Sequence, residues 1–86
     1  MSYEFFILRR AQKELAKIPQ QDYLKIRDTI KSLALEPRPS GCKKLKGRPA
    51  WRIRLGVYRV IYEISDQKLT DTVINVGHRK DVYRDR

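Results

Sequence analysis

The spacing of apolar residues divides the first half of the chain into a strand and two helices. Aromatic and β-branched residues at positions 3–7 predict a short strand. Apolar residues then recur every three or four positions, the period of one helix face, first at Leu8, Ala11, Leu15 and Ile18 and then at Tyr23, Ile26, Ile30, Leu33 and Ala34. Pro19 separates the helices and Pro37 ends the second, because a proline ring cannot continue a helical turn. Two such helices with a short connection form an αα-hairpin whose apolar faces need a cover.

In the second half of the chain apolar and polar residues alternate, which is typical of strands with one buried face. The alternation places Arg52, Arg54 and Arg59 on one face, and the opposite, apolar face carries Trp51, Ile53, Leu55, Tyr58, Val60, Tyr62 and Ile64. Two further strands are expected, at residues 43–45 and at residues 69–76, where Gly77 ends the strand and a charged tail begins.

A loop centred on Leu55 and Gly56 would keep both faces consistent, and it predicts that Arg52 lies directly opposite Arg59. The expected fold is α+β, with the N-terminal strand and the αα-hairpin packed on a small, mainly antiparallel sheet. The length of 86 residues predicts a single domain, residues 1–86.

The distribution of charge points to a function, because the positive charge is concentrated in one segment. The formal net charge is +10, and residues 37–62 hold eight Lys or Arg residues and no acidic residue. Such an asymmetry favours a polyanionic partner, either nucleic acid or an acidic protein. A solvated basic face is the alternative. Like charges directly opposed on two strands are destabilising, so an Arg pair on the sheet favours an anion above it.

Other functional classes are disfavoured by the composition. Cys42 is the only cysteine, which excludes an internal disulfide framework and a cysteine zinc site. We expect no cofactor and no metal. No apolar run approaches the ~18 residues of a membrane span, and residues 1–4 lack the basic and apolar start of a secretory signal. We therefore expect a cytoplasmic protein without a membrane partner.

Five segments, in this order and at this chain length, resemble the RelE/ParE superfamily of bacterial toxin–antitoxin toxins, and its RelE branch best. They are residues 8–19, residues 44–47, Trp51-Arg52-Ile53-Arg54-Leu55, Tyr58-Arg59-Val60-Ile61-Tyr62 and Gly77-His78-Arg79-Lys80-Asp81-Val82-Tyr83. The resemblance implies a RelE-like fold and a ribosome-dependent endoribonuclease that cuts mRNA in the A site. It also implies a cognate acidic antitoxin as partner, beside the 70S ribosome and its mRNA.

The implied reaction is attack of a ribose 2′-hydroxyl on the adjacent phosphate, which needs a base, cations around the phosphorane and an acid. The candidate cations are Arg52, Arg54, Arg59 and Arg79. Known members of the family tend to carry lysines where this chain has Arg52 and Arg54, so these two are expected to stabilise charge rather than to carry protons.

The resemblance also aligns Tyr83 with a tail tyrosine that acts as general base and stacks on a nucleobase. A phenol normally loses its proton only near pH ~10, so surrounding arginines would have to lower its pKa. His78 is a further candidate, because an imidazole can carry a proton near neutral pH. The alternative for His78 is a structural cap at the end of the strand.

The remaining cations of the basic segment are expected to hold ribosomal RNA or mRNA phosphates; these are Lys43, Lys44, Lys46 and Arg48. Two other functions stay open. The first is a ParE-like poison of DNA gyrase, which shares the fold and the charge but cuts no RNA. The second is a non-catalytic basic RNA-binding module.

Overall fold

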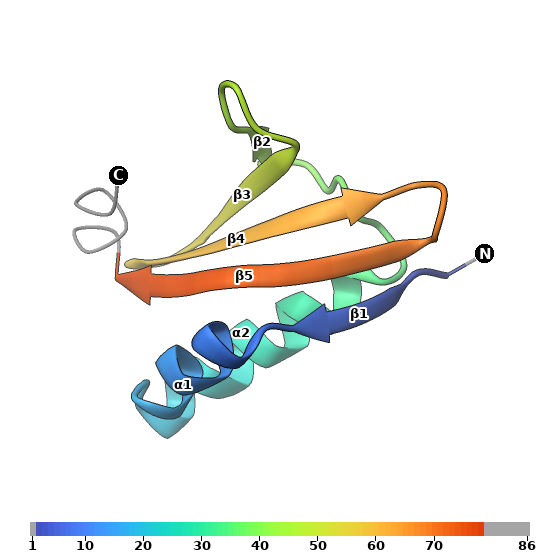
Figure 1. The fold of residues 1–86 in the computed structure, drawn as a ribbon. Coiled ribbons are helices and arrows are strands. Elements are labelled where there is room, and N and C mark those ends of the chain that lie inside the picture. Colours follow the sequence, from blue (N-terminus) through green and yellow to red (C-terminus); the bar gives the residue numbers. More distant parts are fainter. Residues whose placement is uncertain (1, 79–86) are drawn as a thin grey trace.

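The computed structural model describes residues 2–78, which form one five-stranded sheet and two helices (Figure 1). Along the chain the elements are β1 (Glu4–Ile7), α1 (Arg9–Ala16), α2 (Gln20–Leu33), β2 (Lys43–Lys44), β3 (Ala50–Leu55), β4 (Tyr58–Ser65) and β5 (Thr70–His78). The strand order is β1-β5-β4-β3-β2. β1 is parallel to β5, and the other neighbours are antiparallel. This arrangement confirms the predicted α+β fold.

Both helices lie on the same face of the sheet (Figure 1), and no helix of residues 2–78 covers the opposite face, which is called the open face below. The expectation that the last long strand ends at Gly77 is wrong. β5 continues to His78, because Gly77 pairs with Arg59 and His78 pairs with Tyr58 in the antiparallel ladder. No helix within residues 2–78 has both the length and the apolar composition needed to cross a membrane.

The hairpin between β3 and β4 has a different register from the predicted one. Its turn consists of Gly56 and Val57, so Arg54, not Arg52, lies directly opposite Arg59. Gly56 has φ +61°, which suits the first central position of a type II′ turn and is readily adopted only by glycine. The register differs by two residues, so every side chain keeps its predicted face.

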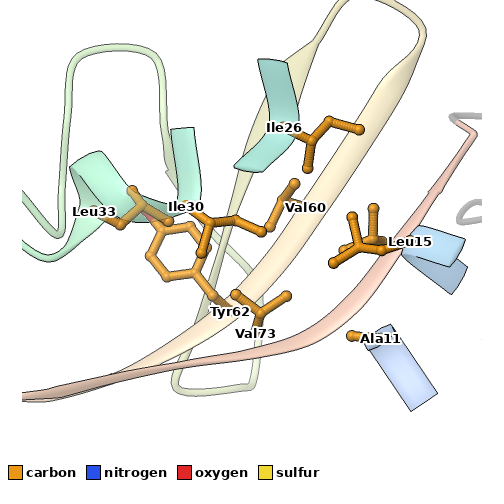
Figure 2. Close-up of a cluster of buried hydrophobic side chains, with 9 residues drawn as sticks. Ala11, Leu15, Ile26, Ile30, Leu33, Val60, Tyr62 and Val73 are labelled. Atoms are coloured by element: carbon orange, nitrogen blue, oxygen red, sulfur yellow. The ribbon is translucent and has the colours of Figure 1, made fainter. Parts of the chain in front are cut away.

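The core lies between the helices and the covered face of the sheet (Figure 2). The two helices contribute Ala11, Leu15, Ile26, Ile30 and Leu33, and the sheet contributes Val60, Tyr62, Val73 and Val76. The hydroxyl of Tyr62 donates a hydrogen bond of 2.7 Å to the carbonyl oxygen of Pro37. Burial raises the pKa of this phenol, so it remains a neutral donor.

A β-bulge in β5 leaves Ile74 without a partner, since Val73 pairs with Tyr62 and Asn75 pairs with Ile61. The carboxylate of Glu14 on α1 accepts hydrogen bonds from the backbone N–H of Val76 (2.7 Å) and from Nδ2 of Asn75 (3.0 Å). A charged acceptor from α1 thus satisfies a backbone donor beside the bulge and ties the helix to β5.

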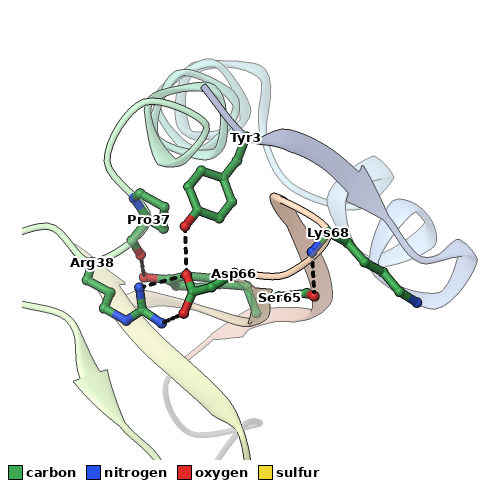
Figure 3. Close-up of polar contacts among 7 residues, drawn as sticks. Tyr3, Pro37, Arg38, Ser65, Asp66 and Lys68 are labelled. Carbon is green, nitrogen blue, oxygen red and sulfur yellow. Dashed lines mark hydrogen bonds and ion pairs between the residues drawn. The ribbon is translucent and has the colours of Figure 1, made fainter. Parts of the chain in front are cut away.

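Asp66, in the turn between β4 and β5, joins the loop after α2 to the N-terminus (Figure 3). Its carboxylate accepts a hydrogen bond of 2.6 Å from the Tyr3 hydroxyl and pairs with Nη2 of Arg38 at 3.0 Å. The hydrogen bonds from Arg38 and, to a smaller extent, from Tyr3 lower the pKa of Asp66. The Arg38 guanidinium also lies 4.7 Å from the centre of the Trp51 ring, so one arginine holds the loop over β3.

Asp71 on β5 is a fully buried carboxylate on the covered face of the sheet. Its strand partners are Phe5 and Ile64, and neither of its oxygens accepts a hydrogen bond within the described part of the chain. Burial raises its pKa to about 6, and the charge of Arg38 offsets part of this rise. A carboxyl group in such surroundings favours its neutral form.

Candidate nucleic-acid interface

Three of the predicted site residues lie together on the open face of the sheet. Arg54 and Arg59 form a directly opposed pair on β3 and β4. Arg52 is two residues before Arg54 on β3, so its side chain shares their face. The strand pattern therefore concentrates three guanidinium groups on the side of the sheet that faces away from the helices.

The three arginines differ in exposure. Arg54 is exposed, Arg52 is half-buried, and Arg59 is only 3% exposed. Gly77, the β5 partner of Arg59, adds no side chain beside it. A guanidinium retains its charge even when it is buried. The site thus combines one enclosed cation with two that solvent can reach.

The lysines of β2 are divided between the two faces of the sheet. Lys43 pairs with Arg52 and so joins the open face. Lys44 pairs with Trp51 on the covered side, where its ammonium lies 5.8 Å from the centre of the Trp51 ring. Nζ of Lys44 also donates a hydrogen bond of 3.3 Å to the carbonyl oxygen of Arg48. Of these two lysines, only Lys43 extends the arginine surface.

Lys46 and Arg48 are exposed in the loop between β2 and β3. Arg79 and Tyr83 lie outside the described residues. Within residues 2–78, no three His, Cys, Asp or Glu side chains are grouped so that they could hold a metal ion.

His78 lies on the opposite face from the arginines. It pairs with Tyr58, and the two rings make an edge contact with centroids 6.1 Å apart. The Tyr58 hydroxyl donates a hydrogen bond of 3.1 Å to Asp22 on α2. Partial burial, followed by this hydrogen bond, raises the pKa of the Tyr58 phenol. His78 is therefore placed beside the helical layer, away from the Arg54 and Arg59 pair.

A groove on the open face was not predicted from the sequence. Its volume is about 400 Å³, and its lining includes Leu8, Arg48, Ile61, Glu63, Ile74 and Asn75. Arg10, which also lines it, lies 3.5 Å from the carboxylate of Glu14. Alternation along β4 indicates that Arg59, Ile61 and Glu63 share a face, but the groove itself needs the bulge at Ile74 and the loop that carries Arg48.

An αα-hairpin on one side of a mixed sheet and a basic surface on the other define a small α+β protein suited to a polyanion. The family of ParE toxins of type II toxin–antitoxin systems (parDE) matches residues 5–83. The chain belongs to the RelE/ParE superfamily and is a toxin of a type II toxin–antitoxin system.

Relatives that match most of the chain are toxins of toxin–antitoxin systems, and several of them are named RelE. Toxin RelG of Mycobacterium tuberculosis is 31% identical over 98% of this chain and 99% of its own length. The toxin in the RelBE2 toxin–antitoxin complex of the same species has a TM-score of 0.82 and 26% identity, covering 92% of this chain and 100% of the relative.

Two further structures agree. The archaeal RelE–RelB complex from Pyrococcus horikoshii matches with a TM-score of 0.83 and 28% identity, over 92% of this chain and 97% of that one. Isolated RelE toxin of E. coli matches with a TM-score of 0.79 and 27% identity, over 96% and 98%. The fold expected from the resemblance is thus confirmed.

Proposed function

We propose that this toxin is a ribosome-dependent endoribonuclease that cleaves mRNA in the A site and thereby inhibits translation. The observation that carries the proposal is the Arg54 and Arg59 pair on the open face of the sheet, with Arg52 beside it. Two opposed cations destabilise a free sheet, and a phosphate bound between them removes that repulsion. The similarity of this chain to RelE toxins supports the same activity, which the family resemblance implies.

The reaction forms a bond between the 2′ oxygen and phosphorus and breaks the bond between phosphorus and the 5′ oxygen. A base takes the 2′ proton, and an acid gives a proton to the leaving 5′ oxygen. Arg52, Arg54 and Arg59 would stabilise the extra negative charge of the phosphorane, because arginine is a permanent cation with several donors. The products are a 2′,3′-cyclic phosphate and a 5′-hydroxyl.

Proton transfer is assigned to the tail of the chain. Tyr83 is proposed as the general base and Arg79 as a fourth cation, both from the family resemblance. His78 remains a second candidate for proton transfer, but its contact with Tyr58 on the covered face makes it the weaker one. Tyr83→Phe and His78→Ala, compared in single-turnover cleavage, separate the two roles.

The partners proposed are the 70S ribosome with its mRNA and an acidic antitoxin, and the proposed location is the cytoplasm, where ribosomes translate. The net charge of +10 suits both a ribonucleic acid and an acidic protein. Two of the structural relatives were solved as toxin–antitoxin complexes, with RelE bound to RelB in one of them. Lys43 and Lys46 are proposed to hold RNA phosphates, and Arg48, which lines the groove, is proposed to contact the RNA there; Lys44 lies over the Trp51 ring on the other face.

A second candidate function is poisoning of DNA gyrase, because the family that matches the chain is described as ParE. A gyrase poison would inhibit supercoiling and leave mRNA intact. A third candidate, a basic module that binds RNA without cutting it, would protect mRNA from other nucleases.

Primer extension on a defined mRNA tests the proposal. Purified toxin is added to the mRNA with and without 70S ribosomes stalled at a known codon. We expect a new 5′ end within the A-site codon only when ribosomes are present. Intact mRNA on toxin-bound ribosomes would instead support the non-catalytic module, and intact mRNA without ribosome binding would require a supercoiling assay with gyrase.

A further inference from the structure

Three charged residues line the groove on the open face and are not used in the proposed cleavage step: Arg10, Arg48 and Glu63. Arg10 lies 3.5 Å from the carboxylate of Glu14, whereas Glu63 and Arg48 make no ion pair and no side-chain hydrogen bond with another residue of the described part. Glu63 is also the first acidic residue after the basic segment of residues 37–62. The negative charge of Glu63 weakens the attraction of the neighbouring basic surface for phosphate. We therefore expect Glu63 to bind a partner other than phosphate.

The groove is continuous with the arginine surface. Arg59, Ile61 and Glu63 follow one another on the same face of β4, at steps of about 6.8 Å. Arg52 lies directly opposite Ile61, so the apolar part of the groove adjoins the proposed phosphate site. A nucleotide whose phosphate lies at the arginines can therefore place its own base, or that of its neighbour, in the groove.

The lining suits a nucleobase better than a second phosphate. Leu8, Ile61 and Ile74 provide apolar surface on which a flat ring can lie. The volume of about 400 Å³ is within the range of small-ligand pockets. Single-stranded RNA is commonly read in this way, by apolar contact with the ring and hydrogen bonds to its edges.

The hydrogen-bonding chemistry of Glu63 and Arg48 favours one of the four bases. A carboxylate has only acceptors, and only guanine offers two neighbouring N–H donors, N1–H and the N2 amino group, on its Watson–Crick edge. Adenine, cytosine and uracil each place an acceptor beside their donor, which a carboxylate repels. Arginine pairs well with the O6 and N7 acceptors on the other edge of guanine. Glu63 and Arg48 therefore complement opposite edges of one base.

We propose that this groove binds a guanine of the A-site codon next to the cleaved phosphate, with Glu63 as the specificity-determining residue and Arg48 on the O6 and N7 edge. The proposal rests on the proposed ribonuclease function. It assigns to Glu63 a role in the choice of codon, not in the chemical step.

The test compares cleavage of stalled ribosome complexes whose A-site codons differ in one base at a time. Wild-type toxin should cut a codon with guanine at one particular position about tenfold or more faster than the other three. Glu63→Gln should lose this preference and favour adenine at that position, because a glutamine amide donates and accepts side by side. Glu36→Gln removes the same charge from an exposed residue outside the groove and should leave the preference unchanged.

The ratio between codons is the readout, since a general gain in RNA affinity from losing a negative charge would raise all four rates together. Equal cutting of all four bases by the wild type, or the same guanine preference in Glu63→Gln, would overturn the groove proposal and leave the ribonuclease intact.

Absence of cleavage on every codon would overturn the ribonuclease function instead. In that case the guanine-binding proposal is tested by measuring the binding of uncleavable 2′-O-methyl oligonucleotides through the methyl NMR signals of Ile61 and Ile74. Larger shifts and tighter binding with guanine than with the other bases support the site, and indistinguishable binding of all four refutes it.

Discussion

Arg54 on β3 lies directly opposite Arg59 on β4, on the face of the sheet that the helices leave open. Two cations in one cross-strand pair repel each other in the free protein. We propose that this pair lowers the stability of the free protein and forms part of an anion-binding site, as expected where function and folding compete.

Replacing Arg54, the exposed member of this pair, should raise the free energy of unfolding and at the same time impair the proposed cleavage of RNA. Arg54→Thr keeps a good strand former and should raise the free energy of unfolding by up to about 0.5 kcal/mol at low salt. The gain should shrink at high salt, because exposed charges are screened. Denaturant unfolding at two salt concentrations measures it, and a loss of stability at low salt would show that the pair is not repulsive.

Arg59, the buried member of the pair, is expected to contribute most to the chemical step. Arg59→Gln should lower the single-turnover cleavage rate by about 10²- to 10³-fold, as expected for loss of one preorganised donor. Arg27→Gln is the matched control, because Arg27 is exposed on α2, far from the sheet in sequence, and forms an ion pair with its neighbour Asp28 at 3.1 Å. Circular dichroism must show that Arg59→Gln is folded. An unchanged rate in the folded variant would remove Arg59 from the mechanism.

The two lysines of β2 provide a paired test of the RNA surface. Lys43→Ala should weaken binding to single-stranded RNA and reduce the slope of log affinity against log salt by about 0.7, the value for one phosphate contact. Lys44→Ala should leave the slope unchanged and alter the fluorescence of Trp51, since Lys44 lies over that ring. Titrations at several salt concentrations give both slopes. Equal effects of the two substitutions would mean that RNA does not discriminate the faces of the sheet.

Asp71 should make stability fall as pH rises. Its pKa is about 6 in the folded protein, above the ~3.9 of an unfolded chain. The folded state therefore holds this proton more tightly, and the contribution of Asp71 is fully present below pH ~4 and lost by about pH 6–7. Asp71→Asn lacks this loss, so it should gain about 3 kcal/mol over the wild type between pH ~4 and neutrality.

Asp66→Asn is a control, because the contribution of Asp66 to stability is expected to change with pH in the opposite direction. Arg38 and Tyr3 lower the pKa of Asp66, so its stabilising contribution is present near neutral pH and is lost as pH falls through the lowered pKa. The Asp66→Asn variant should therefore be less stable than the wild type at pH 7 and approach it in acid. Urea unfolding across this pH range measures both variants. A pH-independent difference between Asp71→Asn and the wild type would contradict the predicted titration.

The sequence by itself determined the faces of the strands. A period of two residues assigned Trp51 and Ile53 to the core and the arginines at positions 52, 54 and 59 to the opposite face, because successive side chains in a strand alternate. The same period explains why the predicted register of the β3–β4 hairpin was wrong. A shift of two residues leaves every face unchanged, and only the conformation of Gly56 in the turn decides between the two registers.

Only the tertiary structure decided which charged residues lie side by side. It separated Lys43 from Lys44, turned His78 toward Tyr58, and brought Glu63 near Arg48 across a groove that depends on the bulge at Ile74. Local patterns specify the direction of a side chain from its own strand. Its neighbours come from strand order, bulges and loop paths, which depend on contacts between residues far apart in the sequence.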